Sequence, residues 1–280
     1  MSNRRNVEFN VESLECRKML AGDVSVEVTG GGDLRIRGDN LDNNISIENS
    51  FFSSGLIITG IDGTTVNGQE SVIISGVTDD FVINMRGGDD TVQIRSEPTS
   101  RFMAVPDDVN FRSGSGNDIL TMDRVLVGDD VRVNTGSGAD VAILHKTTAE
   151  DVRANMGADK DVFEIVFSNI HDDVVVNGGS GGDGFGIRDT NADVVKMVGG
   201  AGDDIFLDGY LPGVSSDLIA SFNISGGGGS DSLVYFNEFG EPAVDFASSI
   251  ETTEVWQFFG GNDYRDFEGY LEASSMIDFI

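Results

Sequence analysis

The sequence predicts an all-β protein, a right-handed parallel β-helix or β-solenoid with about 21–22 residues per coil and glycine-rich turns on one edge. Three observations lead to this expectation. Turns rich in glycine, asparagine and aspartate separate short runs of valine, isoleucine, leucine and phenylalanine, a pattern typical of strands. One aspartate recurs in these turns at a nearly constant interval, and the apolar positions around it keep a fixed register, which indicates stacked repeats. The right hand follows from the strong preference of parallel crossover connections.

The composition of the chain limits its partners. Over 280 residues, 48 Asp and Glu oppose 18 Lys and Arg, which gives a formal net charge of −30. Such a chain repels nucleic acid and anionic membrane surfaces, and it attracts cations. Cys16 is the single cysteine, which excludes an internal disulfide. No apolar run approaches the roughly 18 residues that a membrane span needs, so we expect no span.

Composition also divides the chain into three parts. Residues 1–22 form an export or leader-like segment, residues 23–235 the solenoid, and residues 236–280 an aromatic-rich cap that closes the open end of the core. In the first part, the run LECRKMLA from Leu14 to Ala21 resembles the LEPR-XLL segment near the N-terminus of some large bacterial cell-surface proteins. Cys16 replaces its proline and Met19 one of its leucines. An ordinary amphipathic first helix is the alternative, and for the cap the alternative is an aromatic sugar-binding surface.

The repeat is defined by an aspartate near the end of each glycine turn. We call these residues the turn aspartates: Asp90, Asp118, Asp140, Asp161, Asp183, Asp204, Asp231 and Asp263. From Asp118 to Asp204 they are 21 or 22 residues apart, and the longer intervals elsewhere indicate loop insertions. For each of the first seven turn aspartates, the residues nine and seven positions before it and two positions after it are apolar. This pattern predicts a strand with one buried face on each side of the turn. We expect earlier coils around residues 34–45 and, less regular, at residues 51–80.

Three turns match a known nine-residue motif at every position. Gly178–Gly186, Gly199–Leu207 and Gly226–Val234 have the pattern G-G-x-G-x-D-x-U-x, where U is a large apolar residue. They resemble the RTX, or haemolysin-type, calcium-binding repeat of bacterial secreted β-rolls. In that family each calcium ion lies between adjacent turns with this aspartate as a ligand, a role that the resemblance implies for Asp140, Asp183, Asp204 and Asp231. The chain departs from a true β-roll because it has one motif per coil, and therefore sites on one edge only.

The residues themselves also favour a cation. Stacked coils would place the turn aspartates about 4.8 Å apart, where like charges repel by roughly 1 kcal/mol per pair in water and more in a less polar environment. Calcium binds about six to eight carboxylate and carbonyl oxygens in flexible geometry, which suits glycine turns better than magnesium or zinc does. The alternative is a set of tight turns in which aspartate serves turn formation and solubility. The candidate calcium ligands are Asp118, Asp140, Asp183, Asp204 and Asp231, with Asp90, Asp161 and Asp263 as weaker candidates because their turns have lost motif glycines.

Three further columns share this register. The first is a set of acidic residues ten positions before the turn aspartates, which we call the entry aspartates and interpret as strand-entry turn residues rather than ion ligands. They are Asp80, Asp108, Asp130, Asp151 and Asp173. The second is an asparagine column, for which we predict an amide ladder along the axis: Asn84, Asn134, Asn155 and Asn177. The third is basic and faces outward: Arg132, Arg153 and Lys196.

These patterns predict a secreted or cell-surface calcium-binding solenoid that acts as a structural or adhesive module without catalysis. Its expected partners are calcium, extracellular polysaccharide and other surface proteins, because calcium sites of modest affinity belong outside the cell. The terminal Asp278-Phe279-Ile280 looks like the acidic-then-apolar ending of many exported RTX proteins. The alternative function is a β-helix carbohydrate-active enzyme, a polysaccharide lyase or hydrolase, whose proton-abstracting base would come from the basic column. No residue in the sequence is set apart as such an acid or base.

Overall fold

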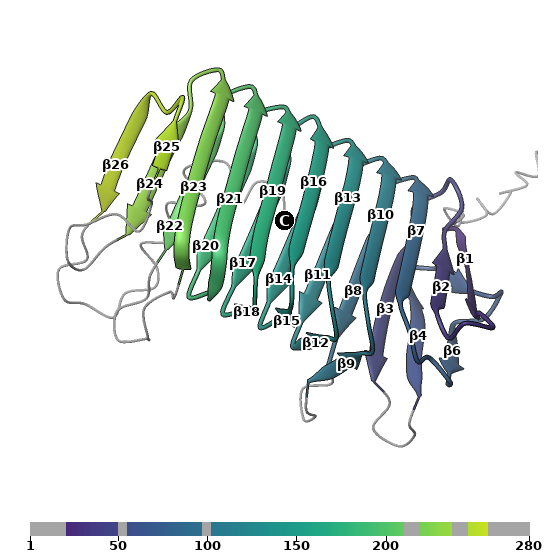
Figure 1. Cartoon of the computed structure of the whole chain (residues 1–280). Helices are drawn as coiled ribbons and strands as arrows, with labels where there is room; N and C mark the ends of the chain where they lie inside the picture. Colours follow the sequence, from purple (N-terminus) through teal and green to yellow (C-terminus); the bar gives the residue numbers. More distant parts are fainter. Residues whose placement is uncertain (1–20, 50–54, 97–101, 210–218, 237–245, 257–280) are drawn as a thin grey trace, which may run out of the picture.

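The computed structural model describes residues 21–49, 55–96, 102–209, 219–236 and 246–256. Within these residues the protein is all-β and contains no helix, which confirms the predicted class. Two long sheets and a short third sheet run along one axis, with the strands of neighbouring coils side by side (Figure 1). In this part of the chain no helix has the length and apolar composition needed to cross a membrane.

The first sheet has 11 strands. In spatial order they are β25 (Phe246–Ser248), β23 (Ile219–Gly228), β21 (Ala192–Ala201), β19 (Asp173–Ser180), β16 (Val152–Ala158), β13 (Val131–Ser137), β10 (Val109–Ser115), β7 (Phe81–Gly87), β2 (Leu34–Arg37), β1 (Asp23–Val28) and β5 (Thr65–Val66).

The second sheet also has 11 strands, and the third has four. The second consists of β26 (Thr252–Trp256), β24 (Ser232–Phe236), β22 (Ile205–Gly209), β20 (Gly184–Arg188), β17 (Val162–Val166), β14 (Val141–His145), β11 (Ile119–Asp123), β8 (Thr91–Arg95), β3 (Asn44–Asn49), β4 (Leu56–Ile61) and β6 (Ser71–Ile74). The third consists of β18 (Asn169–Ile170), β15 (Thr148–Ala149), β12 (Val125–Val127) and β9 (Met103–Val105).

The chain passes from the first sheet through a glycine turn to the second sheet, and returns by way of the third. From β7 onward the pairing is parallel in every sheet, an arrangement consistent with a β-solenoid, and the coils from β8 to β19 return through a strand of the third sheet. The register is the one that the sequence predicts, since Val109 pairs with Val131, Val131 with Val152, and so on along the column. Hydrogen-bonded turn aspartates of neighbouring coils are 28, 22, 21, 22, 21 and 27 residues apart.

The core consists of stacked apolar columns, as expected. Every residue assigned to the inward positions nine and seven before the turn aspartates, and two after them, is buried, from Phe81 to Ile224 and from Val92 to Leu233. A further inward column, four positions after the turn aspartates, begins with Ile94 and Met122. Phe185 and Phe206 stack in adjacent coils with ring centroids 5.0 Å apart, which shows how one column becomes continuous.

The expectation of a second, less regular coil at residues 51–80 is wrong. There β4 pairs antiparallel with both β3 and β6, so this segment folds back over the N-terminal end instead of winding on. Between β5 and β6, the pair Asn67-Gly68 has positive φ angles (51° and 72°), and reciprocal hydrogen bonds between Val66 and Gln69 make a tight hairpin. Asn-Gly is a strong signal for such a turn. The coil expected at residues 34–45 is present, because β2 pairs parallel with β7 and β3 parallel with β8.

At the other end, parallel pairing continues past residue 236, where the aromatic-rich composition begins. Strand β25 adds to β23, and β26 adds to β24. The leader-like segment with Cys16 lies outside the described residues, as do Asp263 and the residues after Trp256.

The turn glycines are required by close approach between coils. Gly200 has a φ of +111°, and a Cβ built on it would lie 2.2 Å from the carbonyl oxygen of Gly179 in the preceding coil. The same contact recurs from coil to coil, so the glycines let successive backbones stack directly on one another.

We therefore expect Gly200→Ala to lower the free energy of unfolding by roughly 2–4 kcal/mol, from left-handed strain and overpacking together. Urea denaturation followed by circular dichroism measures this change. Gly228→Ala is the matched control, because Gly228 lacks a positive φ and its Cβ would meet nothing within 4 Å. Equal losses for the two variants would contradict the stacking explanation.

Candidate functional site

The turn aspartates form one buried column, the aspartate column, along the edge where the first sheet turns into the second. Each precedes a strand of the second sheet directly, as Asp118 precedes β11 and Asp204 precedes β22. The seven described members are at most 1% exposed: Asp90, Asp118, Asp140, Asp161, Asp183, Asp204 and Asp231. The sequence predicts their register but does not predict their nearly complete burial.

One carboxylate oxygen of each side chain completes a hydrogen bond to the neighbouring coil. The backbone N–H of Asp118 donates to Oδ1 of Asp140 at 2.8 Å, and that of Asp183 donates to Oδ1 of Asp204 at 2.8 Å. All six links between described turn aspartates have this form. The column therefore supplies acceptors to turn N–H groups that would otherwise be buried without a partner.

Both ends of the column are occupied by residues that the motif did not indicate. At the N-terminal end, the N–H of Asn43 donates to Asp90 at 2.8 Å. At the C-terminal end, the N–H of Asp231 donates to the Glu251 carboxylate at 2.6 Å, so the neighbour of Asp231 is Glu251. A coil of ordinary length would pair Ser232 with Thr252, as observed, and would place Glu251 next to Asp231. The glycine motif does not identify Glu251, because the turn before it lacks that motif.

The second carboxylate oxygen has no hydrogen-bond partner in any of the seven aspartates. In the three complete motifs this Oδ2 occupies the space left by the absent side chain of the first motif glycine. A Cβ on Gly199 would lie 2.0 Å from Oδ2 of Asp204 and 2.7 Å from the carbonyl oxygen of Gly226 in the next coil. Gly178 and Gly226 show the same pair of oxygens. A buried carboxylate oxygen without a hydrogen-bond partner needs a proton or a cation beside it.

In other coils the equivalent place is filled by a side chain. The hydroxyl of Ser113 donates to the carbonyl oxygen of Thr135 at 2.8 Å, and the hydroxyl of Thr135 donates to the carbonyl oxygen of Met156. Met85 and Met156 fill it with apolar atoms in the turns of Asp90 and Asp161. The glycine turns of Asp183, Asp204 and Asp231 are thus the ones in which Oδ2 and a carbonyl oxygen meet without a side-chain donor.

Burial disfavours the charged form of the column aspartates from Asp90 to Asp204. It raises the pKa of Asp183 to about 6, of Asp90, Asp140 and Asp204 to about 7, and of Asp161 to about 8, against backbone hydrogen bonds that act in the opposite direction. It raises the pKa of Asp118 as well. Without a cation, the folded column therefore holds protons at a pH where unfolded aspartates have lost them.

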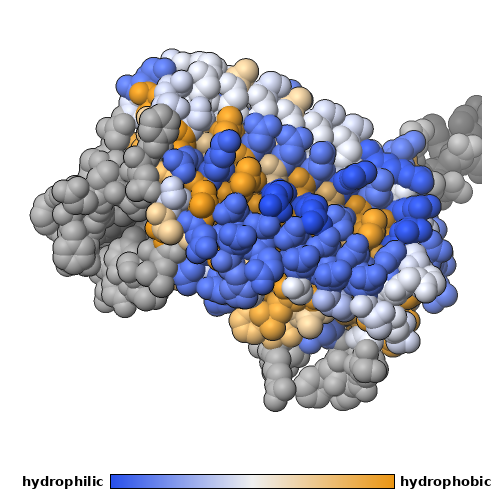
Figure 2. Space-filling model, in the orientation of Figure 1, coloured by the Kyte–Doolittle hydropathy of each residue, from blue (hydrophilic) through white to orange (hydrophobic). Residues whose placement is uncertain are grey.

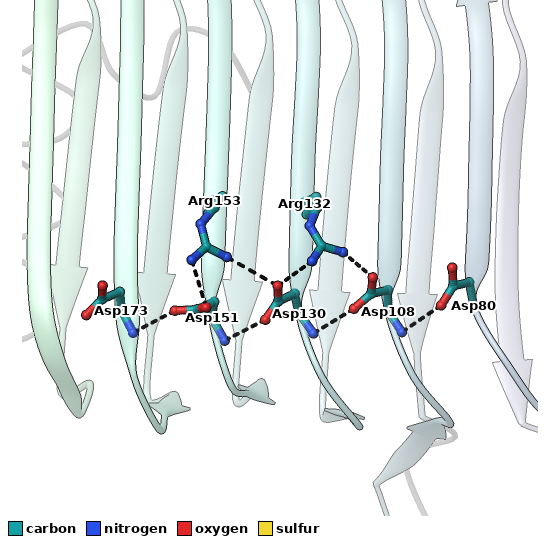
Figure 3. Close-up of polar contacts among 7 residues, drawn as sticks. All are labelled: Asp80, Asp108, Asp130, Arg132, Asp151, Arg153 and Asp173. Carbon is teal, nitrogen blue, oxygen red and sulfur yellow. Dashed lines mark hydrogen bonds and ion pairs between the residues drawn. The ribbon is translucent and has the colours of Figure 1, made fainter.

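The entry aspartates form a second ladder, on the edge where the return segment enters the first sheet (Figure 3). The N–H of Asp130 donates to Asp108 at 3.0 Å, and that of Asp173 donates to Asp151 at 3.0 Å, so these carboxylates accept hydrogen bonds from the turns, while their exclusion as ion ligands stays a prediction. Two groups of three carboxylates, which share Asp107, bring their oxygens within 4.8 Å of one another at this edge: Asp79, Asp80 and Asp107, and Asp107, Asp108 and Asp129. The aspartate column forms no such triple among the described residues.

The two arginines of the basic column are paired with the entry aspartates. Arg132 contacts Asp108 and Asp130, and Arg153 lies 3.2 Å from Asp130 and 2.8 Å from Asp151 (Figure 3). Burial opposes the charge of Arg132, but the hydrogen bond to Asp108 and the negative charges of Asp108, Asp130 and Asp129 together outweigh this effect and raise the pKa of the guanidinium. The carboxylates of Asp108 and Asp130 both pair with Arg132, so this arginine is not set apart as a free base and gives no support to the enzymatic alternative.

In the predicted asparagine ladder, one link between side chains is present among the described residues: the Asn177 amide donates to Asn155 at 3.0 Å.

No family model matches the chain, and neither the curated proteins nor the solved structures gave a match. The resemblance to RTX repeats therefore rests on the three nonapeptides.

The raised pKa values predict how stability depends on pH when divalent ions are removed. Between about pH 4 and pH 8 the folded column binds more protons than the unfolded chain, so the free energy of unfolding falls as pH rises. Urea denaturation in excess chelator at steps from pH 4 to pH 8 measures this slope. A stability that rises with pH over this range would show that the column is ionised and satisfied in the folded protein.

Proposed function

We propose that this protein is a secreted or cell-surface β-solenoid of the RTX type that binds calcium and serves as a structural or adhesive module. In this proposal the winding is right-handed, with about 21–22 residues per coil. The observation that supports it is the pair of acceptors in each complete motif, a buried aspartate Oδ2 without a hydrogen-bond partner and a carbonyl oxygen of the next coil, both beside the first motif glycine.

Calcium suits this pair better than a proton does under extracellular conditions. Near neutral pH a carboxyl group with a pKa of about 7, such as that of Asp204, is only partly protonated, so protons alone leave part of the column charged. Calcium ligands are carboxylate and carbonyl oxygens at about 2.3–2.6 Å, in flexible geometry. Because the aspartate column gathers no three carboxylates, most ligands there would be backbone carbonyls, and the affinity would suit millimolar calcium.

Calcium bound in this way would hold adjacent coils together. An ion shared by Asp204 and the carbonyl of Gly226 joins β22 to the following coil, and it binds only when the two are stacked in register. Its binding free energy therefore adds to the stability of the fold. Such a protein is rigid outside the cell and loosens when calcium is withdrawn, which is the behaviour of a structural module.

The test is Asp204→Asn. The amide retains an oxygen for the N–H of Asp183, and its NH₂ group can donate to the carbonyl of Gly226 where Oδ2 could not. In chelator the variant should melt at a temperature equal to or higher than that of the parent protein. Isothermal titration calorimetry should show the loss of one calcium equivalent or at least a tenfold weaker site, and calcium should raise the melting temperature less.

Two further variants locate the ion. Asp203→Asn removes the same charge at the adjacent exposed position, whose carboxylate accepts the N–H of Ser230 at 2.8 Å, and it should leave calcium binding unchanged. Asp107→Asn removes the residue shared by the exposed carboxylate groups. If Asp107→Asn abolishes binding while Asp204→Asn does not, the ion belongs to the entry edge and the proposed site is wrong. An absence of calcium uptake by the parent protein would refute the calcium-binding function itself.

A further inference from the structure

The outward face of the first sheet carries a cavity of about 320 Å³ that the calcium site does not use. It spans β10, β13 and β16, and its polar lining comes from Asn110, Arg112, Arg132, Asn134, Arg153 and Asn155. In the space-filling view, hydrophilic residues cover much of the face formed by these strands, with apolar patches between them (Figure 2). The volume is within the range of small-ligand sites, roughly 300–1,000 Å³.

The lining is ordered by the register of the coils. Asn110, Arg132 and Arg153 pair with one another across β10, β13 and β16, and Arg112, Asn134 and Asn155 form a parallel row two positions further along each strand. Each row therefore presents a polar side chain about every 4.8 Å along the axis. Three coils give a polar track roughly 10–14 Å long with hydrogen-bonding groups on both sides.

The charges of this track are largely compensated. Arg132 and Arg153 are held by Asp108, Asp130 and Asp151, which fixes the guanidinium groups and neutralises them. These pairs leave further guanidinium N–H groups of both arginines free to donate. The exposed Asn134 and Asn155 each offer an amide donor and a carbonyl acceptor. The surface thus provides donors and acceptors at fixed spacing with little net charge, whereas the chain as a whole carries −30.

From this geometry we propose that the track binds an uncharged polysaccharide, lying along the solenoid axis with about one sugar residue per coil. Sugar hydroxyl groups both donate and accept hydrogen bonds, and the repeat of an extended pyranose chain is close to the spacing of the coils. An acidic polysaccharide fits less well, because two of the three guanidinium groups that line the cavity are already paired with entry aspartates and the net charge of the protein repels polyanions. The inference gives the adhesive role a partner class, and it does not depend on calcium.

The test is binding of defined oligosaccharides to the full chain by isothermal titration calorimetry. The probes are hexamers of β-1,4-linked glucose, mannose, xylose and N-acetylglucosamine and of α-1,4-linked glucose, with a polygalacturonate hexamer as the acidic probe. We expect at least one neutral hexamer to bind, with a Kd that changes less than about twofold between low and high salt. The double variant Asn134→Ala/Asn155→Ala should weaken that binding at least tenfold, because it removes two sets of hydrogen bonds.

Asn84→Ala is the matched control, since Asn84 is an exposed asparagine of the same column that lies outside the cavity. It should bind like the parent protein, and circular dichroism and melting temperature should be unchanged in all variants. The proposal is overturned if no neutral hexamer binds at millimolar concentration, or if Asn84→Ala weakens binding as much as the double variant does. It is also overturned if polygalacturonate binds more tightly than every neutral probe with a steep salt dependence. Failure of calcium binding would leave these outcomes unaffected as long as the protein is folded.

Discussion

The structure depends on how the coils satisfy the backbone N–H groups of their turns. A strand satisfies its own groups through the sheet, but a turn between sheets has no ladder of its own and must find acceptors in the next coil. Carboxylates supply them on both edges: Asp118 donates to Asp140 on the glycine-turn edge, and Asp130 donates to Asp108 on the entry edge. The two ladders run in opposite directions along the axis, so each coil is tied to both neighbours. Much of the acidity of the chain follows from this requirement.

The aspartate column uses one oxygen of each carboxylate for this purpose and leaves the other to be accommodated. The residue beside this second oxygen differs along the column. Met156 fills the adjacent space with apolar atoms, while Thr135 brings a hydroxyl that satisfies the next carbonyl. Gly199 admits Oδ2 itself beside a carbonyl oxygen. Only the third arrangement places Oδ2 and a carbonyl oxygen beside each other without a side chain in between, so the complete motif marks a local change in chemistry within a column whose structural role is constant.

Much of the repeat could be predicted from the sequence, because a period in the chain becomes a register in space. The apolar columns that contain Val131 and Phe206 were assigned correctly for this reason. Features without a period escaped prediction. The Asn67-Gly68 hairpin is a local signal that a search for repeats passes over, and Glu251 follows a shortened turn without glycines. The sequence could not predict the Oδ2 atoms without hydrogen bonds either, because they depend on which oxygen of the carboxylate the N–H of the neighbouring coil reaches.

The two proposed sites share the stacking of the coils as their common basis. The calcium pair requires Asp204 to lie beside the carbonyl of a residue 22 positions later, and the polar track requires Asn134 and Asn155 to lie side by side on adjacent strands. A slip of one residue in a coil would turn side chains to the opposite face and break both alignments. An ion that stabilises the stack would therefore also keep the polar track aligned, although the aspartate column and the track lie in different parts of the fold. If both proposals hold, calcium would control adhesion without touching the adhesive face.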